Sequence, residues 1–116
     1  MGLYPVRGKP VNALDEQKAT ITTAATMLAG MSARNPGTSD VWMLAYNATL
    51  GNVSLGTTEP IARMWVPADG YNSEQFPHPV EAFTALTVAA APNKDGSGGA
   101  ISTDIEAMVY YCQGVV

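Results

Sequence analysis

The chain has 116 residues, close to the usual size of one domain, and only 14% of them are charged. Its six basic side chains are scattered and outnumbered by ten acidic ones, so the net charge is −4. That balance argues against nucleic-acid binding and against attraction to an anionic membrane. No apolar run approaches the roughly 20 residues that a membrane-spanning helix needs.

The low charge predicts an exterior built from Thr, Ser, Asn, Gly and Ala. Such a surface loses little on desolvation, so we expect a homo-oligomer or an assembly component, with a neutral monomer as the alternative. The first residues lack a signal-peptide pattern. The single cysteine, Cys112, excludes an intrachain disulfide. We therefore expect the chain to fold in a cytoplasm.

Residues 1–12 predict an extended N-terminal arm, because two prolines remove backbone donors there and the apolar residues show no periodicity. Leu3, Tyr4 and Val6 are the apolar anchors of this arm, and we expect them to contact a partner. Simple fraying of the terminus is the alternative. Residues 13–116 contain no repeat and no linker, which predicts a single globular domain.

Asn12 and Asp15 have the spacing of a helix cap, so we expect a helix over 13–18. Residues 19–28 fit either a helix, from their apolar spacing, or a strand, from their β-branched run. Residues 80–91 are equally ambiguous, because they both alternate and carry helical spacing.

Short apolar runs bounded by turn residues predict strands elsewhere in the chain. These runs are 41–46, 61–66 and 108–112, with 52–55 as a short hairpin partner of the first. In the second run, Ile61, Arg63 and Trp65 share one face. Trp42 and Trp65 are expected in the core. Together the segments predict an α+β fold, mostly β, with one or two helices.

The residues that could carry chemistry are few. His78 is the only histidine and lies between two prolines in a long predicted loop, 67–79. With one His and one Cys, the usual zinc ligand set is missing. The glycines at 96–99 are not followed by the Lys-Ser or Lys-Thr of a phosphate loop. We therefore predict no catalytic residue, no cofactor and no metal, and an enzyme centred on His78 is the last alternative.

Two aromatic residues of the long loop, Tyr71 and Phe76, are candidate interface anchors, because aromatic side chains dominate interface energetics. They join the three arm residues as the predicted partner-binding set. Packing of both rings against their own domain is the alternative.

Four segments are similar, in order and spacing, to the middle of the lambda-type head decoration proteins of tailed phages. They are Met-Ser-Ala-Arg-Asn-Pro at 31–36, Met-Leu at 43–44, Gly-Thr-Thr at 56–58 and Val-Pro-Ala-Asp at 66–69. The resemblance implies a small mixed β domain that forms trimers on a capsid surface, with an N-terminal arm that becomes ordered on the shell. It implies no catalytic residue.

The leading hypothesis is therefore a virion structural protein, assembled in the host cytoplasm, that decorates or cements a shell by binding the major capsid protein or other virion subunits. One alternative is a ring-forming tail or neck protein of the virion. Another is a small carbohydrate- or ligand-binding module that uses the Trp and Tyr side chains.

Overall fold

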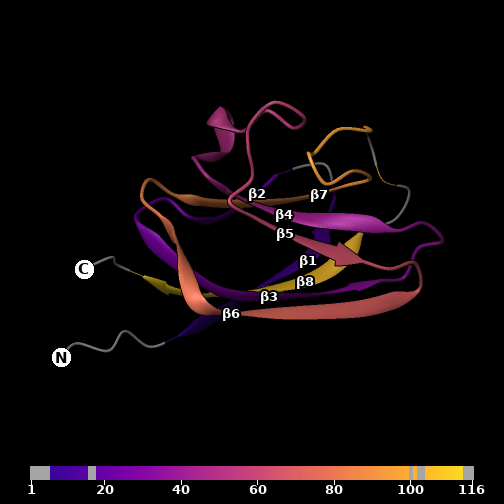
Figure 1. The fold of residues 1–116 in the computed structure, drawn as a ribbon, viewed down its shortest axis with the longest axis horizontal. Coiled ribbons are helices and arrows are strands. Elements are labelled where there is room, and N and C mark those ends of the chain that lie inside the picture. Colours follow the sequence, from indigo (N-terminus) through magenta and orange to yellow (C-terminus); the bar gives the residue numbers. More distant parts are fainter. Residues whose placement is uncertain (1–5, 16–17, 100, 102–103, 114–116) are drawn as a thin grey trace.

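A computed structural model describes residues 6–15, 18–99, 101 and 104–113 of the chain. The part described is a sandwich of two four-stranded sheets, with one short 3-10 turn, η1 (Leu50–Asn52) (Figure 1). The strands are β1 (Arg7–Leu14), β2 (Ala19–Thr22), β3 (Thr26–Asn35), β4 (Val41–Asn47), β5 (Ala62–Val66), β6 (Gly70–Ala82), β7 (Leu86–Ala91) and β8 (Ile105–Gln113).

Sheet A has the strand order β1-β8-β3-β6, and sheet B has the order β2-β7-β4-β5. All neighbours pair antiparallel. Apart from the step from β4 to β5, each successive strand crosses to the other sheet, as Figure 1 shows for β6, which curves from the lower layer up toward β7. Eight antiparallel strands wound across two sheets in this order form a jelly roll.

The main core lies between the two sheets and follows the period of two that a strand imposes. In β5, Ala62, Met64 and Val66 point into the core, whereas Arg63 and Trp65 point outward. The largest side chains buried there are Leu14, Leu28, Met31, Met43, Met64, Leu86 and Ile105.

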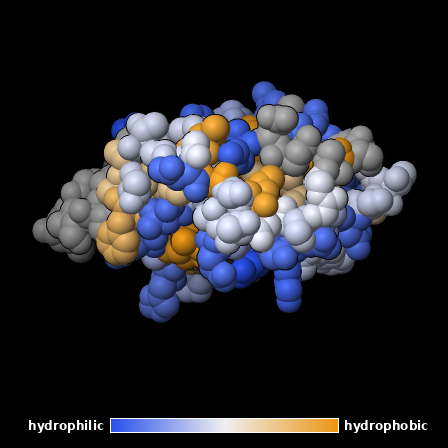
Figure 2. Space-filling view, turned by 90° about the horizontal axis from the view of Figure 1, so that it is seen from above, coloured by the Kyte–Doolittle hydropathy of each residue, from blue (hydrophilic) through white to orange (hydrophobic). Residues whose placement is uncertain are grey.

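Sheet B has a second, smaller core on its outer face. Leu44 and Tyr46 of β4 pack there with Val53, which belongs to the segment 48–60 that crosses above the sheet. This segment therefore covers sheet B with the protein's own chain. Figure 2 looks onto this side and shows hydrophobic residues only in small separate spots.

The predicted α+β fold with one or two helices is wrong, because the structure is nearly all β. The capping pattern at Asn12 begins no helix, since β1 runs on to Leu14. Residues 19–28 form β2, a turn and the start of β3, so the β-branched run prevails. Residues 80–91 are the end of β6, a short link and all of β7. Apart from Thr87, β7 is apolar without alternation, because both of its faces are buried.

Two further expectations change. The segment 52–55 is not the hairpin partner of β4, whose partner is β5. The predicted loop 67–79 is largely strand β6, which carries little hydrophobic periodicity because it is a mostly exposed edge strand. The strands predicted at 41–46, 61–66 and 108–112 are confirmed as β4, β5 and part of β8.

Candidate functional site

The outer face of sheet A is the main candidate contact surface. Directly paired residues of antiparallel strands point to the same side, so the register defines rows across this face. The first row consists of Gly8, Tyr110, Gly30 and Gln75. The second row consists of Pro10, Met108, Ser32 and Ser73.

Neither row contains a charged side chain. The outward face of an antiparallel sheet is normally polar where it meets water, and here only Gln75, Ser32 and Ser73 supply polar groups besides the Tyr110 hydroxyl. Charge begins at the next row, where Arg34 stands between Glu106 and Tyr71. Tyr110 is 37% exposed in the middle of the uncharged band. A Cβ on Gly8 would lie 3.5 Å from its ring, so the ring lies over that glycine.

A shallow depression of about 290 Å³ opens within this face. Its lining residues are Val6, Ala29, Gly30, Gln75, Phe76 and Tyr110. It forms where the β3–β6 ladder opens. Gly30 pairs with Gln75 and Leu28 pairs with Val80, so the four residues 76–79 stand opposite Ala29 alone.

The predicted partner-binding residues fall into three groups. Val6, 59% exposed, and Phe76, half-buried, are brought together in the depression. Tyr71 is exposed on the same face but lies beside Arg34, in the charged row. Leu3 and Tyr4 lie outside the described residues.

The structure adds Gly30 of β3 and Tyr110 of β8 to the candidate contact residues. Both were missing from the residues predicted from the sequence, because they lie in different strands and no motif connects them. Only part of the predicted N-terminal arm, residues 1–12, can be an arm separate from the domain. Its residues 7–12 belong to β1, which pairs with β8 and completes sheet A.

The two free edges of sheet A, β1 and β6, are poor places for a further strand to add. In β1, Pro10 lacks a backbone donor and Lys9 turns toward sheet B, where its ammonium donates to the carbonyl of Thr20 at 3.2 Å. In β6, Pro77 and Pro79 interrupt the outer edge. These features favour contact through the face of sheet A over contact through its edges.

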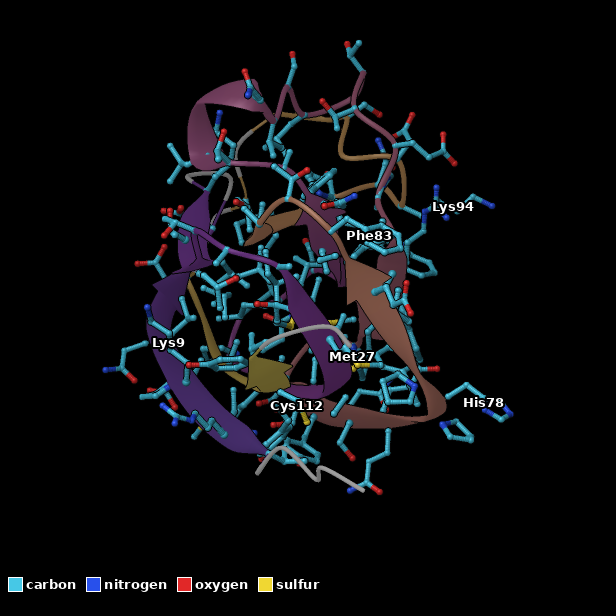
Figure 3. All side chains as sticks on the ribbon, turned by 90° about the vertical axis from the view of Figure 1, so that its left-hand side faces the viewer. Lys9, Met27, His78, Phe83, Lys94 and Cys112 are labelled. Carbon is cyan, nitrogen blue, oxygen red and sulfur yellow. The ribbon has the colours of Figure 1, made fainter. Side chains whose placement is uncertain are left out.

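The candidate catalytic histidine lies apart from the single cysteine. His78 is exposed at the outer corner of β6 and points away from the molecule, far from the labelled Cys112 (Figure 3). Within the described ranges no group of three or more His, Cys, Asp or Glu side chains is placed to hold a metal ion. No helix in the same ranges has the length and hydropathy needed to cross a membrane.

The expectation of a buried Trp65 is wrong. Trp65 is 45% exposed, because it lies on the outer face of sheet B at the edge strand β5. Trp42 of β4 stands directly opposite it and is half-buried against the second core. The pair thus forms an aromatic surface at the rim of the covered face.

The fold and the site together define a small jelly-roll protein. The chain's own segment 48–60 covers the outer face of sheet B, whereas no segment among the described residues covers that of sheet A. No family model matches the chain, and no curated protein matches it significantly.

Proposed function

We propose that this protein is a structural subunit of a virion, a capsid decoration or cement subunit that stabilises the shell by clamping neighbouring capsid subunits. The observation that carries this proposal is the contrast between the two outer faces. Sheet B is covered by the protein's own segment 48–60. The uncharged rows of sheet A have no such cover within the described chain.

The contact surface is the band around Tyr110, with the depression between Val6 and Phe76 beside it. Aromatic residues in desolvated pockets supply most of the binding energy of protein interfaces, whereas charge is depleted at their centres. This band has both properties, and a partner side chain could enter its depression.

Two further observations support an assembly role. Jelly rolls occur in viral capsid proteins and lectins, although a fold alone does not fix a function. Two segments of the phage resemblance, 31–36 and 66–69, meet at one end of the sandwich. There Asn35 donates its side-chain amide to the carbonyl of Val66 at 3.3 Å.

A subunit that binds only the assembled shell stabilises it by mass action. At a free concentration one hundred times Kd the gain is about 2.7 kcal/mol per bound site. Many equivalent sites on one shell multiply this gain, so modest affinity suffices. The resemblance implies that the protein acts as a trimer.

The test is decoration of shells that lack the protein, measured by co-sedimentation. Tyr110→Lys places a charge in the uncharged band, and we expect it to lower affinity by about 10-fold or more. The matched control is Thr57→Lys, an exposed position on the covered side, which keeps wild-type binding. If both variants decorate shells equally, sheet A is not the contact face.

Deletion of residues 1–5 tests Leu3 and Tyr4 separately. A longer deletion through residue 10 would also remove the start of β1 and confuse loss of contact with loss of fold. We expect the shorter deletion to reduce shell occupancy while the domain stays folded. Mass in solution completes the test: a trimer supports decoration, whereas a ring of six or twelve subunits points to the tail or neck.

A further inference from the structure

A second depression, of about 500 Å³, opens on the outer face of sheet B, away from the face proposed to contact the shell. It is lined by Trp42, Asn93, Lys94, Asp95 and Ser97. Among the described residues, Trp42 supplies the aromatic group of this lining, and Asn93, Lys94, Asp95 and Ser97 come from the loop after β7. Trp65 stands opposite Trp42 on the same face.

The loop is held in shape by its own hydrogen bonds. The Asp95 carboxylate accepts from the Ser97 hydroxyl at 2.6 Å and from the Ser97 backbone N–H at 2.9 Å. The Asn93 amide donates to the Ser97 hydroxyl oxygen at 3.3 Å. These bonds fix three polar side chains side by side before any ligand arrives.

The loop is also fixed to the sandwich. Arg63 of β5 donates its Nε–H to the carbonyl of Lys94 at 2.8 Å. Gly96 has φ +91°, and a Cβ there would lie 3.0 Å from the Tyr46 hydroxyl and 2.9 Å from the Gly56 nitrogen. The loop therefore rests tightly on the second core. A site preformed in this way avoids the entropic cost of ordering a loop on binding.

The chemistry of the lining narrows the ligand. An indole offers an apolar π face, whereas an amide, a carboxylate and a hydroxyl offer donors and acceptors at its margin. A ligand that uses all of them needs one apolar face and several hydroxyl groups around its edge. Hydrogen bonds from Ser97 lower the pKa of Asp95, so its carboxylate is ionised. Lys94, also in the lining, carries the opposite charge, so the two side chains together give the depression no net charge that would select a charged ligand.

We infer that this depression binds a neutral carbohydrate. One pyranose ring stacks its C–H face on Trp42, and its hydroxyl groups bond to Asn93, Asp95 and Ser97. The inference goes beyond the proposed function. The two outer faces belong to opposite layers of the sandwich, so docking through sheet A would leave the sugar site exposed.

The experiment uses the isolated full-length protein, so its outcome does not depend on shell binding. Maltose, cellobiose, lactose and diacetylchitobiose are each titrated by saturation-transfer NMR and by tryptophan fluorescence. For one shallow site we expect a Kd of about 1–10 mM for at least one of these sugars. Saturation should be strongest at the C–H protons of one ring face.

Two variants locate the site. Trp42→Ala removes the stacking surface, and we expect it to weaken binding by about 10-fold or more. Because Trp42 also packs on the second core, Asp95→Ala at an exposed position gives an independent readout, and a similar loss is expected. Tyr71→Ala, an exposed aromatic position on sheet A, is the control and retains wild-type affinity.

The inference is overturned if none of the four sugars binds at about 50 mM, a concentration well above the expected Kd. It is equally overturned if a sugar binds but Trp42→Ala and Asp95→Ala, both confirmed folded by circular dichroism, leave its affinity unchanged. If the wild-type protein does not decorate shells but still binds a sugar, the proposed function fails and this site stands.

Discussion

A Cβ placed on Gly30 of β3 would lie 2.7 Å from the carbonyl oxygen of Glu74 in β6. Gln75, the next residue, pairs with Gly30, and beyond it the ladder opens around residues 76–79. The absence of a side chain at Gly30 thus allows β6 to approach β3 closely at the edge of the depression. The φ of Gly30 is not in the left-handed region, so backbone conformation does not explain the glycine. The close approach of β6 does.

Gly30→Ala should destabilise the fold, because the obstacle is a backbone carbonyl that cannot rotate away. We expect the free energy of unfolding to fall by about 1–3 kcal/mol, the usual cost of overpacking. Urea denaturation measures this change. Gly51→Ala is the control, because a Cβ there meets nothing within 4 Å, and its effect should stay within about 0.5 kcal/mol. Equal effects at the two glycines would contradict the steric explanation.

Asn35 links the end of β3 to the turn that follows it and to the end of β5. It is 1% exposed; its amide donates to the carbonyl of Ser39 at 2.8 Å, and its carbonyl oxygen accepts from the N–H of Gly37 at 2.9 Å. Asn35→Ala removes the hydrogen-bond partner of the Gly37 N–H and of the Ser39 carbonyl at a buried position. The free energy of unfolding should fall by about 2–3 kcal/mol.

Thermal unfolding of Asn35→Ala, compared with wild type, gives the measurement. Asn52→Ala is the matched control, because that amide is exposed and bonds only locally, to the Thr49 hydroxyl at 3.1 Å. Its effect should be within about 0.5 kcal/mol. A melting temperature for Asn35→Ala as high as that of Asn52→Ala would show that the turn does not depend on this side chain.

Three of the strands could be predicted from the sequence, because each combines a strand-like run with a clear boundary. The runs that became β4, β5 and β8 combine β-branched or aromatic residues with flanking turns. Segment 80–91 could not be assigned from the sequence, because its pattern depends on what covers it. Segment 48–60 buries the outer side of β7, so both faces of this strand are apolar and its sequence lacks the alternation typical of a strand with one exposed face.

The candidate site is harder to predict, because register creates it. Val6 and Phe76 are seventy positions apart in sequence, and they meet only because β1, β8, β3 and β6 lie in that order. Neither Tyr110 nor Gly30 carries a local signal that it lies on this face. For Trp65 a signal existed: its alternation partner Arg63 is charged, which already placed that face of the strand toward solvent.

Lys18 holds the covering segment of sheet B in place. Its ammonium donates to the carbonyl of Val53 at 2.6 Å, and Val53 is one of the buried residues of the second core. Lys18→Met keeps the length of the side chain but loses this charge-assisted bond. We expect a loss of about 1–2 kcal/mol in stability, together with faster amide exchange in residues 49–58.

Hydrogen-exchange mass spectrometry of the folded protein checks this expectation. Lys94→Met removes the same charge from an exposed position and serves as the control. Exchange in 49–58 should be unchanged in that variant. If Lys18→Met also leaves exchange unchanged, the covering segment is held by its apolar contacts alone.

Tyr46 carries a hydroxyl that is fully buried and has no hydrogen-bond partner within the part of the chain that the structure describes. Burying an unpaired hydroxyl costs stability, whereas the ring fills the second core beneath Gly96. Tyr46→Phe keeps the ring and removes the unpaired group. At neutral pH we therefore expect a stability equal to wild type or higher by up to about 1 kcal/mol.

The same hydroxyl gives a pH signature. Burial raises the pKa of Tyr46 above its ordinary value of 10.0, so the folded protein keeps a proton that the unfolded chain loses. The corresponding stability is fully present below pH 10 and is lost as the pH rises from there through the raised pKa, by up to about 1.4 kcal/mol per pH unit. Urea denaturation from pH 8 to pH 11 should therefore show a steeper decline above pH 10 for wild type than for Tyr46→Phe. Parallel declines of the two proteins would mean that the hydroxyl is not desolvated in the folded state.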